Sequence, residues 1–260
     1  MLELVRNVGW RTIENVHGLG GITVFGSRIV FETLAPPYRL RRILDELYNT
    51  GVLSLAIVCA SGTAVGLVLG LQGYNTLVRF GAEQSMGAVV GLSLERELGP
   101  VLTALLVTGR AGSAVATEIG VMVASEQLDG LRMMSVDPID FVAQPKALAL
   151  AIAMPLLSAL FIVCGLFGGY LVGVGLLGID AGTYVSSLEN SISFRNDVLG
   201  SVVKSVVFGM LVGLVSTWRG YKSEPNSEGV GRATTGAVVQ ASVATLMLDY
   251  VITALWGVGV

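Results

Sequence analysis

Five long apolar stretches are the feature that most constrains this chain. They cover residues 51–71, 86–108, 147–177, 198–218 and 235–258. A helix needs about 20 apolar residues to cross the hydrocarbon core of a bilayer, so each stretch is long enough. Hydrocarbon offers the backbone no hydrogen-bond partner, and each stretch is therefore expected to be a helix. The sequence predicts an all-α integral membrane protein with five transmembrane helices.

The composition agrees with this class and argues against an enzyme. Only 13% of the residues are charged and 53% are hydrophobic, whereas a soluble domain carries about 25% charge. Cys59 and Cys164 both lie in apolar stretches, and the single histidine, His17, lies near the N-terminus. None of the three lysines lies in a phosphate-binding loop motif. We expect no metal, no bound cofactor and no ATP hydrolysis by this chain itself.

Residues 1–50 form a region of a different character, which precedes a 51–260 permease domain. Apolar and charged residues alternate there at loosely helical spacing, which is typical of a helix that lies in the membrane interface. The apolar members are Leu2, Val5, Val8, Ile13 and Val16. A soluble amphipathic helix packed on a partner protein is the alternative.

The positive charges predict an orientation. Twelve of the sixteen lysines and arginines lie in residues 1–50, 109–146 and 219–234. Residues 72–85 and 179–197 hold one each. Because cytoplasmic loops of membrane proteins are enriched in Lys and Arg, we expect a cytoplasmic N-terminus and an outward-facing C-terminus.

Charged residues interrupt three of the apolar stretches. Glu95, Arg96 and Glu97 lie in the second, Lys204 in the fourth and Asp249 in the fifth. Such charges are costly in lipid and face partners or cavities. Lys204 and Asp249 are expected to form an intramembrane ion pair, which either fixes the bundle or has a functional role. The triplet is expected to face a water-filled or headgroup-lined cavity, unless the second stretch is broken or re-entrant. The sequence assigns no role to Glu95.

The segment between the second and third stretches has two expected parts. The small residues at 109–112 predict a turn, and SEQLDGLRMM predicts a short polar cytoplasmic helix. In that helix Glu126 and Asp129 are expected on one face, with Leu128 and Leu131 on another. An acidic face beside an apolar strip suits docking into a cytoplasmic protein, although an ordinary solvated helix would have the same spacing.

Several motifs resemble those of the MlaE-type permeases, the membrane subunits of MCE-associated ABC phospholipid transporters. The resemblance covers nearly the whole chain and rests on LYNTGVLSL, GLVLGLQGY, LERELGPVLTALLVTGRAGSAVATEIG, EQLDGLRMMSVDP, VVKSVVFG, GVGRATTGAVV and LDYVITAL. In that family the E-Q-x-D-A-L segment is the coupling helix that seats in the ATPase. Gly130 replaces the alanine here, which adds backbone freedom.

The resemblance implies a homodimeric permease of the bacterial inner membrane that moves glycerophospholipid between membranes and supports outer-membrane lipid asymmetry. Its implied partners are a cytoplasmic ABC ATPase that binds the ATP, a STAS-domain regulator and a periplasmic MCE-domain hexamer. The implied coupling residues are Glu126, Gln127, Asp129 and Leu131. The implied lipid-binding residues are Arg96, Glu97, Leu69, Gln72, Tyr74, Leu77 and Phe80.

Two other classes of membrane protein remain open. An ion-coupled secondary transporter would use the intramembrane charges as an ion relay and would need no ATPase, although the chain has no evident inverted repeat. A non-transporting anchor for a periplasmic lipid-binding protein would explain the polar helix but not the intramembrane charges. Co-purification of an ATPase discriminates between these classes.

Overall fold

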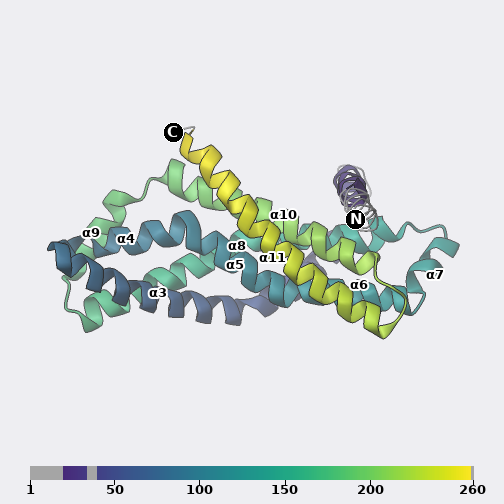
Figure 1. Ribbon diagram of the computed structural model, residues 1–260, viewed down its shortest axis with the longest axis horizontal. Helices are drawn as coiled ribbons and strands as arrows, with labels where there is room; N and C mark the ends of the chain where they lie inside the picture. Colours follow the sequence, from purple (N-terminus) through teal and green to yellow (C-terminus); the bar gives the residue numbers. More distant parts are fainter. Residues whose placement is uncertain (1–19, 34–39, 259–260) are drawn as a thin grey trace, which may run out of the picture.

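The computed structural model describes residues 20–33 and 40–258, and all regular elements in these ranges are helical. Most of the helices run lengthwise in an elongated bundle, with α7 at one end and α9 at the other (Figure 1). Five helical stretches are long and apolar enough to cross a membrane: Leu40–Phe80, Glu83–Ala124, Ile139–Leu176, Phe194–Tyr221 and Ser227–Leu255. The prediction of an all-α protein with five candidate spans is confirmed.

The first span begins earlier than the sequence predicted. It is built from α2 (Leu40–Thr50), a 3-10 turn (Val52–Ser54), α3 (Leu55–Leu77) and a second 3-10 turn (Val78–Phe80). Residues 40–50 therefore lead straight into the membrane helix. Helix 20–33 runs crosswise to the bundle, as a helix lying in the interface would. The predicted helical positions from Leu2 to Val16 lie outside the described residues.

The second span is one continuous helical path, and the predicted turn at 109–112 is wrong. After the short turn Glu83–Ser85, the path runs through α4 (Met86–Ser93), α5 (Gly99–Val107) and α6 (Ser113–Ala124). Two π-helical segments, Leu94–Leu98 and Thr108–Gly112, join these helices. The small residues at 109–112 allow close helix packing and do not form a turn. A Cβ on Gly112 would lie 2.9 Å from the Ser216 hydroxyl oxygen of α10.

The remaining elements complete the bundle. The short helix α7 (Gln127–Met133) precedes a π-helical segment (Ile139–Ala143), α8 (Gln144–Tyr170) and a second such segment (Leu171–Leu176). The helix α9 (Ala181–Ser191) lies between the third and fourth spans. A π-helical segment (Phe194–Val198) leads into α10 (Leu199–Tyr221), and α11 (Ser227–Val258) ends the described chain.

Glycines at four-residue spacing bring α3 and α8 into direct backbone contact. A Cβ on Gly66 would lie only 1.9 Å from the Gly165 carbonyl oxygen, and one on Gly62 2.6 Å from the Phe161 carbonyl oxygen. Helices in lipid associate through such close packing, because lipid tails are as apolar as the side chains and the hydrophobic effect does not drive association there. These glycine repeats therefore serve helix packing. The α3–α8 seam fixes the first span against the centre of the bundle.

Candidate functional site

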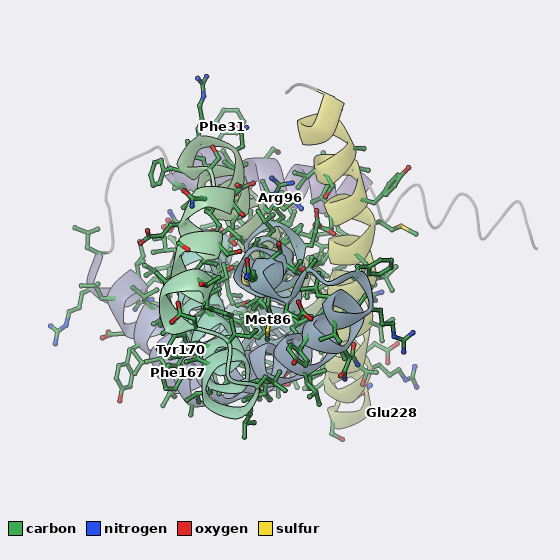
Figure 2. All side chains as sticks on the ribbon, turned by 90° about the vertical axis from the view of Figure 1, so that its left-hand side faces the viewer. Phe31, Met86, Arg96, Phe167, Tyr170 and Glu228 are labelled. Carbon is green, nitrogen blue, oxygen red and sulfur yellow. The ribbon has the colours of Figure 1, made fainter. Side chains whose placement is uncertain are left out.

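The charged triplet lies on the π-helical segment Leu94–Leu98, between α4 and α5. A π-helical turn inserts a residue into the helical ladder and is frequent at functional sites. In the end-on view of Figure 2, Arg96 lies nearer the middle of the bundle than Phe31 or Glu228 does. The second stretch is thus neither broken nor re-entrant, and its backbone hydrogen bonds continue through the triplet.

Arg96 pairs with a carboxylate that sequence reasoning missed. Its Nε lies 2.6 Å from Oδ1 of Asp197, at the start of the fourth span. The Asp197 side chain is only 2% exposed, and its Oδ2 accepts a hydrogen bond from the Ser193 backbone at 2.6 Å. The Arg96 side chain is 55% exposed. Asp197 therefore orients Arg96 through Nε and leaves the outer part of the guanidinium accessible.

Glu97 belongs to a second charged cluster, which joins three spans. Lys204 Nζ donates to Glu97 Oε2, to the Arg96 carbonyl oxygen and to Thr253 Oγ1, each at 2.8 Å. The same nitrogen lies 3.2 Å from Asp249 Oδ1. The expected neighbours Lys204 and Asp249 are thus brought together, and Glu97 and Thr253 join them. A buried lysine with two carboxylates and a hydroxyl has its charge well compensated.

Glu95 points into the protein. Its residue exposure is 9%, and no ion pair to it occurs within residues 20–33 and 40–258. The nearby carboxylate of Asp197 is engaged by Arg96 and by the Ser193 backbone. The three adjacent charges therefore have three different environments: one buried, one half-exposed and one in the Lys204 cluster.

The predicted lipid-contacting residues divide between two cavities. Leu69, Gln72 and Leu77 line a cavity of about 280 Å³ between α3 and α4. This cavity reaches Ser93, directly before the π-helical segment that carries the triplet. Its remaining lining residues are Gly73, Thr76, Val89 and Val90. A mainly apolar cavity that ends three residues before Arg96 in the chain suits an alkyl chain.

Tyr74 faces a different and more polar cavity of about 320 Å³, which also contains Glu83 and Asp180. Asp180 caps α9: its Oδ2 accepts hydrogen bonds from the Thr183 backbone at 2.8 Å and the Thr183 hydroxyl at 3.1 Å. These hydrogen bonds hold the pKa of Asp180 below its ordinary value. Phe80 lines neither cavity and is highly exposed. The structure of one chain therefore brings together only part of the predicted lipid-binding set.

The polar helix between the second and third spans exists as α7 and Leu128 and Leu131 do share a face, but the predicted acidic face is wrong. Glu126 precedes the helix with a left-handed backbone (φ 58°), so it does not share a helical face with Asp129. Leu128 is buried in the core of the bundle, and Leu131 is partly buried against it. The predicted apolar strip therefore packs inward and is not free to dock.

The exposed apolar surface of this region lies at the end of α7 instead. Met133 is 89% exposed and Met134 67%. Arg132 binds Asp129 and the Tyr221 hydroxyl, both at 2.6 Å, which ties α7 to the end of α10. Spacing alone could not find the methionines, because the period of a helix does not say which face its own bundle covers.

A buried lysine at the same end of the bundle also escaped sequence reasoning. Lys146 of α8 contacts Glu46 of α2 and Glu118 of α6, each at 2.7 Å. Its side chain is 3% exposed. This cluster of one lysine and two glutamates joins the first, second and third spans near α7. Within the described ranges, no group of three His, Cys, Asp or Glu side chains could hold a metal ion, and Cys59 and Cys164 are free thiols.

Comparisons with known proteins agree closely with one another. A sequence model of the family described as Permease MlaE matches residues 43–255. The intermembrane phospholipid transport system permease protein MlaE of Haemophilus influenzae is 44% identical over 98% of both chains. A probable ABC transporter permease protein of Rickettsia bellii is 40% identical over 98% of both chains. TRIGALACTOSYLDIACYLGLYCEROL 1, a chloroplast protein of Arabidopsis thaliana, is 32% identical over 90% of this chain and 67% of its own.

Proposed function

The chain belongs to the MlaE permease family, and we propose that its charged clusters and α7 take part in phospholipid transport. It is the non-catalytic membrane permease of an ABC-type intermembrane phospholipid transport system. The system includes an ATPase partner and a lipid substrate. The chain is a multi-pass protein homologous to an inner-membrane permease.

The lipid headgroup binds at Arg96 and Glu97, with an acyl chain along the cavity between α3 and α4. The observation that carries this proposal is the half-exposed Arg96 side chain, whose Nε is held by Asp197. An oriented guanidinium can grip a phosphate with two parallel hydrogen bonds. Glu97, 43% exposed, supplies a carboxylate for the amine of a zwitterionic headgroup. Leu69, Gln72 and Leu77 line the path of the chain, while Tyr74 and Phe80 contact lipid nearer the end of the bundle.

Coupling to the ATPase involves α7 and the residues on either side of it. Glu126, Gln127 and Asp129 present polar groups, and Met133 and Met134 add an exposed apolar surface. Methionine side chains adapt well to irregular partner surfaces. Leu131 acts from inside, by packing α7 on the core. Force applied to α7 would reach the bundle through the Arg132–Tyr221 contact.

The further partners and the orientation follow the same reasoning. We place α7 and the N-terminus in the cytoplasm and the C-terminus in the periplasm of the inner membrane. The working unit contains a second permease copy, two ATPase subunits, a STAS-domain regulator and a periplasmic MCE-domain hexamer. The distribution of Lys and Arg supports the orientation, and the family supports the partners.

Photocrosslinking tests the lipid site. A diazirine amino acid at Leu77 or Phe80 of the assembled complex should capture phospholipid, and Arg96→Glu should reduce that capture at least fivefold. Arg79→Glu is the matched control, because Arg79 is an exposed arginine on the turn after α3. Arg96→Lys keeps a cation beside Asp197 but loses the two parallel hydrogen bonds, so it should give an intermediate loss without unfolding.

Equal capture in wild type, Arg96→Glu and Arg96→Lys would show that the headgroup does not bind at this cluster. Capture that falls equally with Arg79→Glu would point to a general effect of charge on the outer end of the bundle. Either outcome would assign the triplet a structural role.

A further inference from the structure

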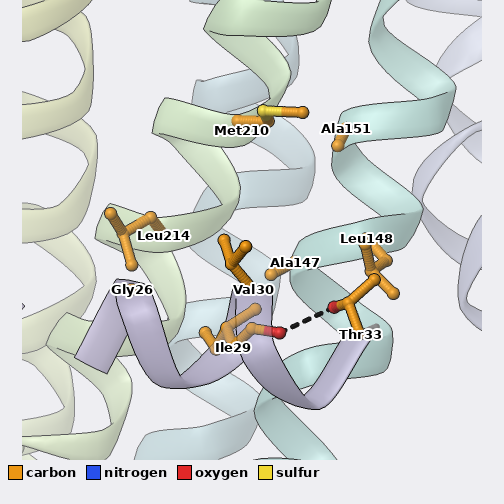
Figure 3. Close-up of a pocket in the computed structure, with 9 residues that line it drawn as sticks. All are labelled: Gly26, Ile29, Val30, Thr33, Ala147, Leu148, Ala151, Met210 and Leu214. Carbon is orange, nitrogen blue, oxygen red and sulfur yellow. Dashed lines mark hydrogen bonds between the residues drawn. The ribbon is translucent and has the colours of Figure 1, made fainter. Parts of the chain in front are cut away.

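A third cavity, of about 300 Å³, lies between helix 20–33, α8 and α10, apart from the charged clusters (Figure 3). Helix 20–33 crosses the two spans and closes one end of the cavity. Its Val30 side chain points along the cavity, toward Met210 and Ala151. The described residues that line it are Gly26, Ile29, Val30, Thr33, Ala147, Leu148, Ala151, Met210 and Leu214.

Among the residues that the structure describes, the lining offers no free hydrogen-bonding side chain. Thr33 has the only polar side chain among the nine residues, and its hydroxyl donates to the Ile29 carbonyl oxygen at 2.7 Å. A water molecule in such a cavity would lack the two to four polar partners that it needs. The occupant is therefore neutral and apolar.

The cavity opens toward the surface that the spans present to the bilayer. Its α8 and α10 residues belong to the candidate spans Ile139–Leu176 and Phe194–Tyr221. On α8, Ile152 and Leu156 follow Leu148 at four-residue spacing, so they lie on the same helix face, and both are exposed. On α10 the exposed residue Val203 lies two turns from Met210. The cavity is thus continuous with the lipid-facing surface.

The apolar lining of the cavity favours an alkyl chain over an extended protein segment. An extended peptide would leave its backbone groups without hydrogen-bond partners, which is unfavourable in an apolar cavity. We propose that this cavity binds one acyl chain of a membrane glycerophospholipid from the leaflet beside helix 20–33. This site is separate from the proposed headgroup site at Arg96 and Glu97.

The bound chain braces helix 20–33 against α8 and α10, and that helix is linked to the region after α7. Arg28 of the helix hydrogen-bonds to Asp137 and, at 2.9 Å, to Glu32. Asp137 lies four residues beyond the end of α7. The wall of the cavity is therefore joined by an ion pair to the segment that follows the proposed coupling helix.

Labelling with a phospholipid that carries a diazirine in one acyl chain tests this site. The assembled complex is placed in nanodiscs of phosphatidylethanolamine and phosphatidylglycerol, illuminated, digested and analysed by mass spectrometry. Ala151→Leu fills the cavity and should reduce labelling of helix 20–33 and of residues 210–214 at least fivefold. Ala159→Leu is the control, because it adds the same side chain on an exposed position of α8. Labelling at Val203 should not change.

A second variant keeps the test decisive if Ala151→Leu fails to fold. Val30 is 60% exposed, so Val30→Ser should fold normally, and it should lower labelling of the cavity about threefold. Labelling that is the same in wild type, Val30→Ser and the control would show only bulk lipid contact and would overturn the site. Crosslinks from a diazirine at Val30 to a protein chain would overturn it too.

Separation from the transport path is tested in the same samples. Arg96→Lys should leave labelling of helix 20–33 unchanged, and Ala151→Leu should leave phospholipid capture at Leu77 unchanged. Loss of cavity labelling in Arg96→Lys would show that one lipid path serves both places, and the claim of a separate site would then be wrong. If Arg96→Glu does not affect capture at Leu77 while Ala151→Leu still lowers cavity labelling, the headgroup proposal fails and the cavity proposal stands.

Discussion

At the scale of single residues, Lys204 is the centre of the charged cluster within the membrane. It contacts Glu97 and Asp249 together, and Glu97 also accepts a hydrogen bond from the Thr253 hydroxyl. Residue types and depth predict a pair between Lys204 and Asp249. The third charge could not be predicted, because the direction of Glu97 depends on the π-helical segment, which no sequence period marks.

Because Lys204 contacts both Glu97 and Asp249, we expect substitutions of Lys204 and of Asp249 to destabilise the protein by different amounts. Lys204→Met should leave two carboxylates facing each other without their cation, and breaking a buried ion pair in this way costs about 3–5 kcal/mol. Because Glu97 is 43% exposed, solvent screens part of this loss, and we expect the lower end of that range. Asp249→Asn leaves the Glu97–Lys204 contact intact and should cost less than about 1 kcal/mol. Thermal unfolding of the purified complex measures both.

A charge swap of Lys204 and Asp249 should not restore stability, since the new aspartate would face Glu97. Equal destabilisation by Lys204→Met and Asp249→Asn would contradict the arrangement, because it would mean that the two residues depend only on each other.

Two substitutions of Glu126 distinguish the effect of its backbone strain from the effect of its charge. A non-glycine residue in the left-handed region costs roughly 1–2 kcal/mol, so Glu126→Gly should raise the unfolding temperature of the permease. The same variant removes a proposed coupling carboxylate and should weaken ATPase association severalfold. Glu126→Gln removes the charge and keeps the strain, so it should weaken association without stabilising the fold. Wild-type association in both variants, measured by co-purification, would remove Glu126 from the coupling surface.

At the scale of elements, hydropathy predicts the number of spans but not their ends. Residues 40–50 and 113–124 are helical extensions of the first and second spans, whereas the predicted stretches began at 51 and ended at 108. Tertiary contacts explain them: Lys146 bridges Glu46 on one extension to Glu118 on the other. The turn predicted at 109–112 fails for a related reason, since small residues allow close packing as readily as they allow turns.

The α3–α8 seam gives the sharpest prediction at this scale. Gly66→Ala would place a methyl group 1.9 Å from the Gly165 carbonyl oxygen, and a backbone atom cannot move away cheaply. Overpacking of this kind costs about 1–3 kcal/mol or more. Gly73→Ala is the matched control on the same helix, because nothing lies within 4 Å of its added methyl group. Monodisperse yield and unfolding temperature should fall for Gly66→Ala only; equal values would show that the seam is looser than described.

At the scale of the whole molecule, the bundle separates two activities along its length. The proposed acyl-chain cavity lies between α3 and α4, the proposed headgroup residue Arg96 contacts Asp197 just before α10, and α7 lies at one end of the bundle (Figure 1). The long path from α4 through α5 to α6 runs between them without a break. Exposed apolar residues along α11, among them Val243 and Met247, suit lipid or the second permease copy. The sequence motifs predicted the family and its partners, whereas one chain alone does not complete the lipid site.

We propose that ATP hydrolysis by a partner, and no ion gradient, drives phospholipid movement through this permease. The direct measurement is transfer of fluorescent phospholipid in proteoliposomes that contain the complex purified with this chain. Transfer should require ATP, stop with vanadate and continue when ionophores collapse all ion gradients. Transfer that proceeds without ATP and stops with ionophores would contradict the account and would make the chain an ion-coupled secondary transporter.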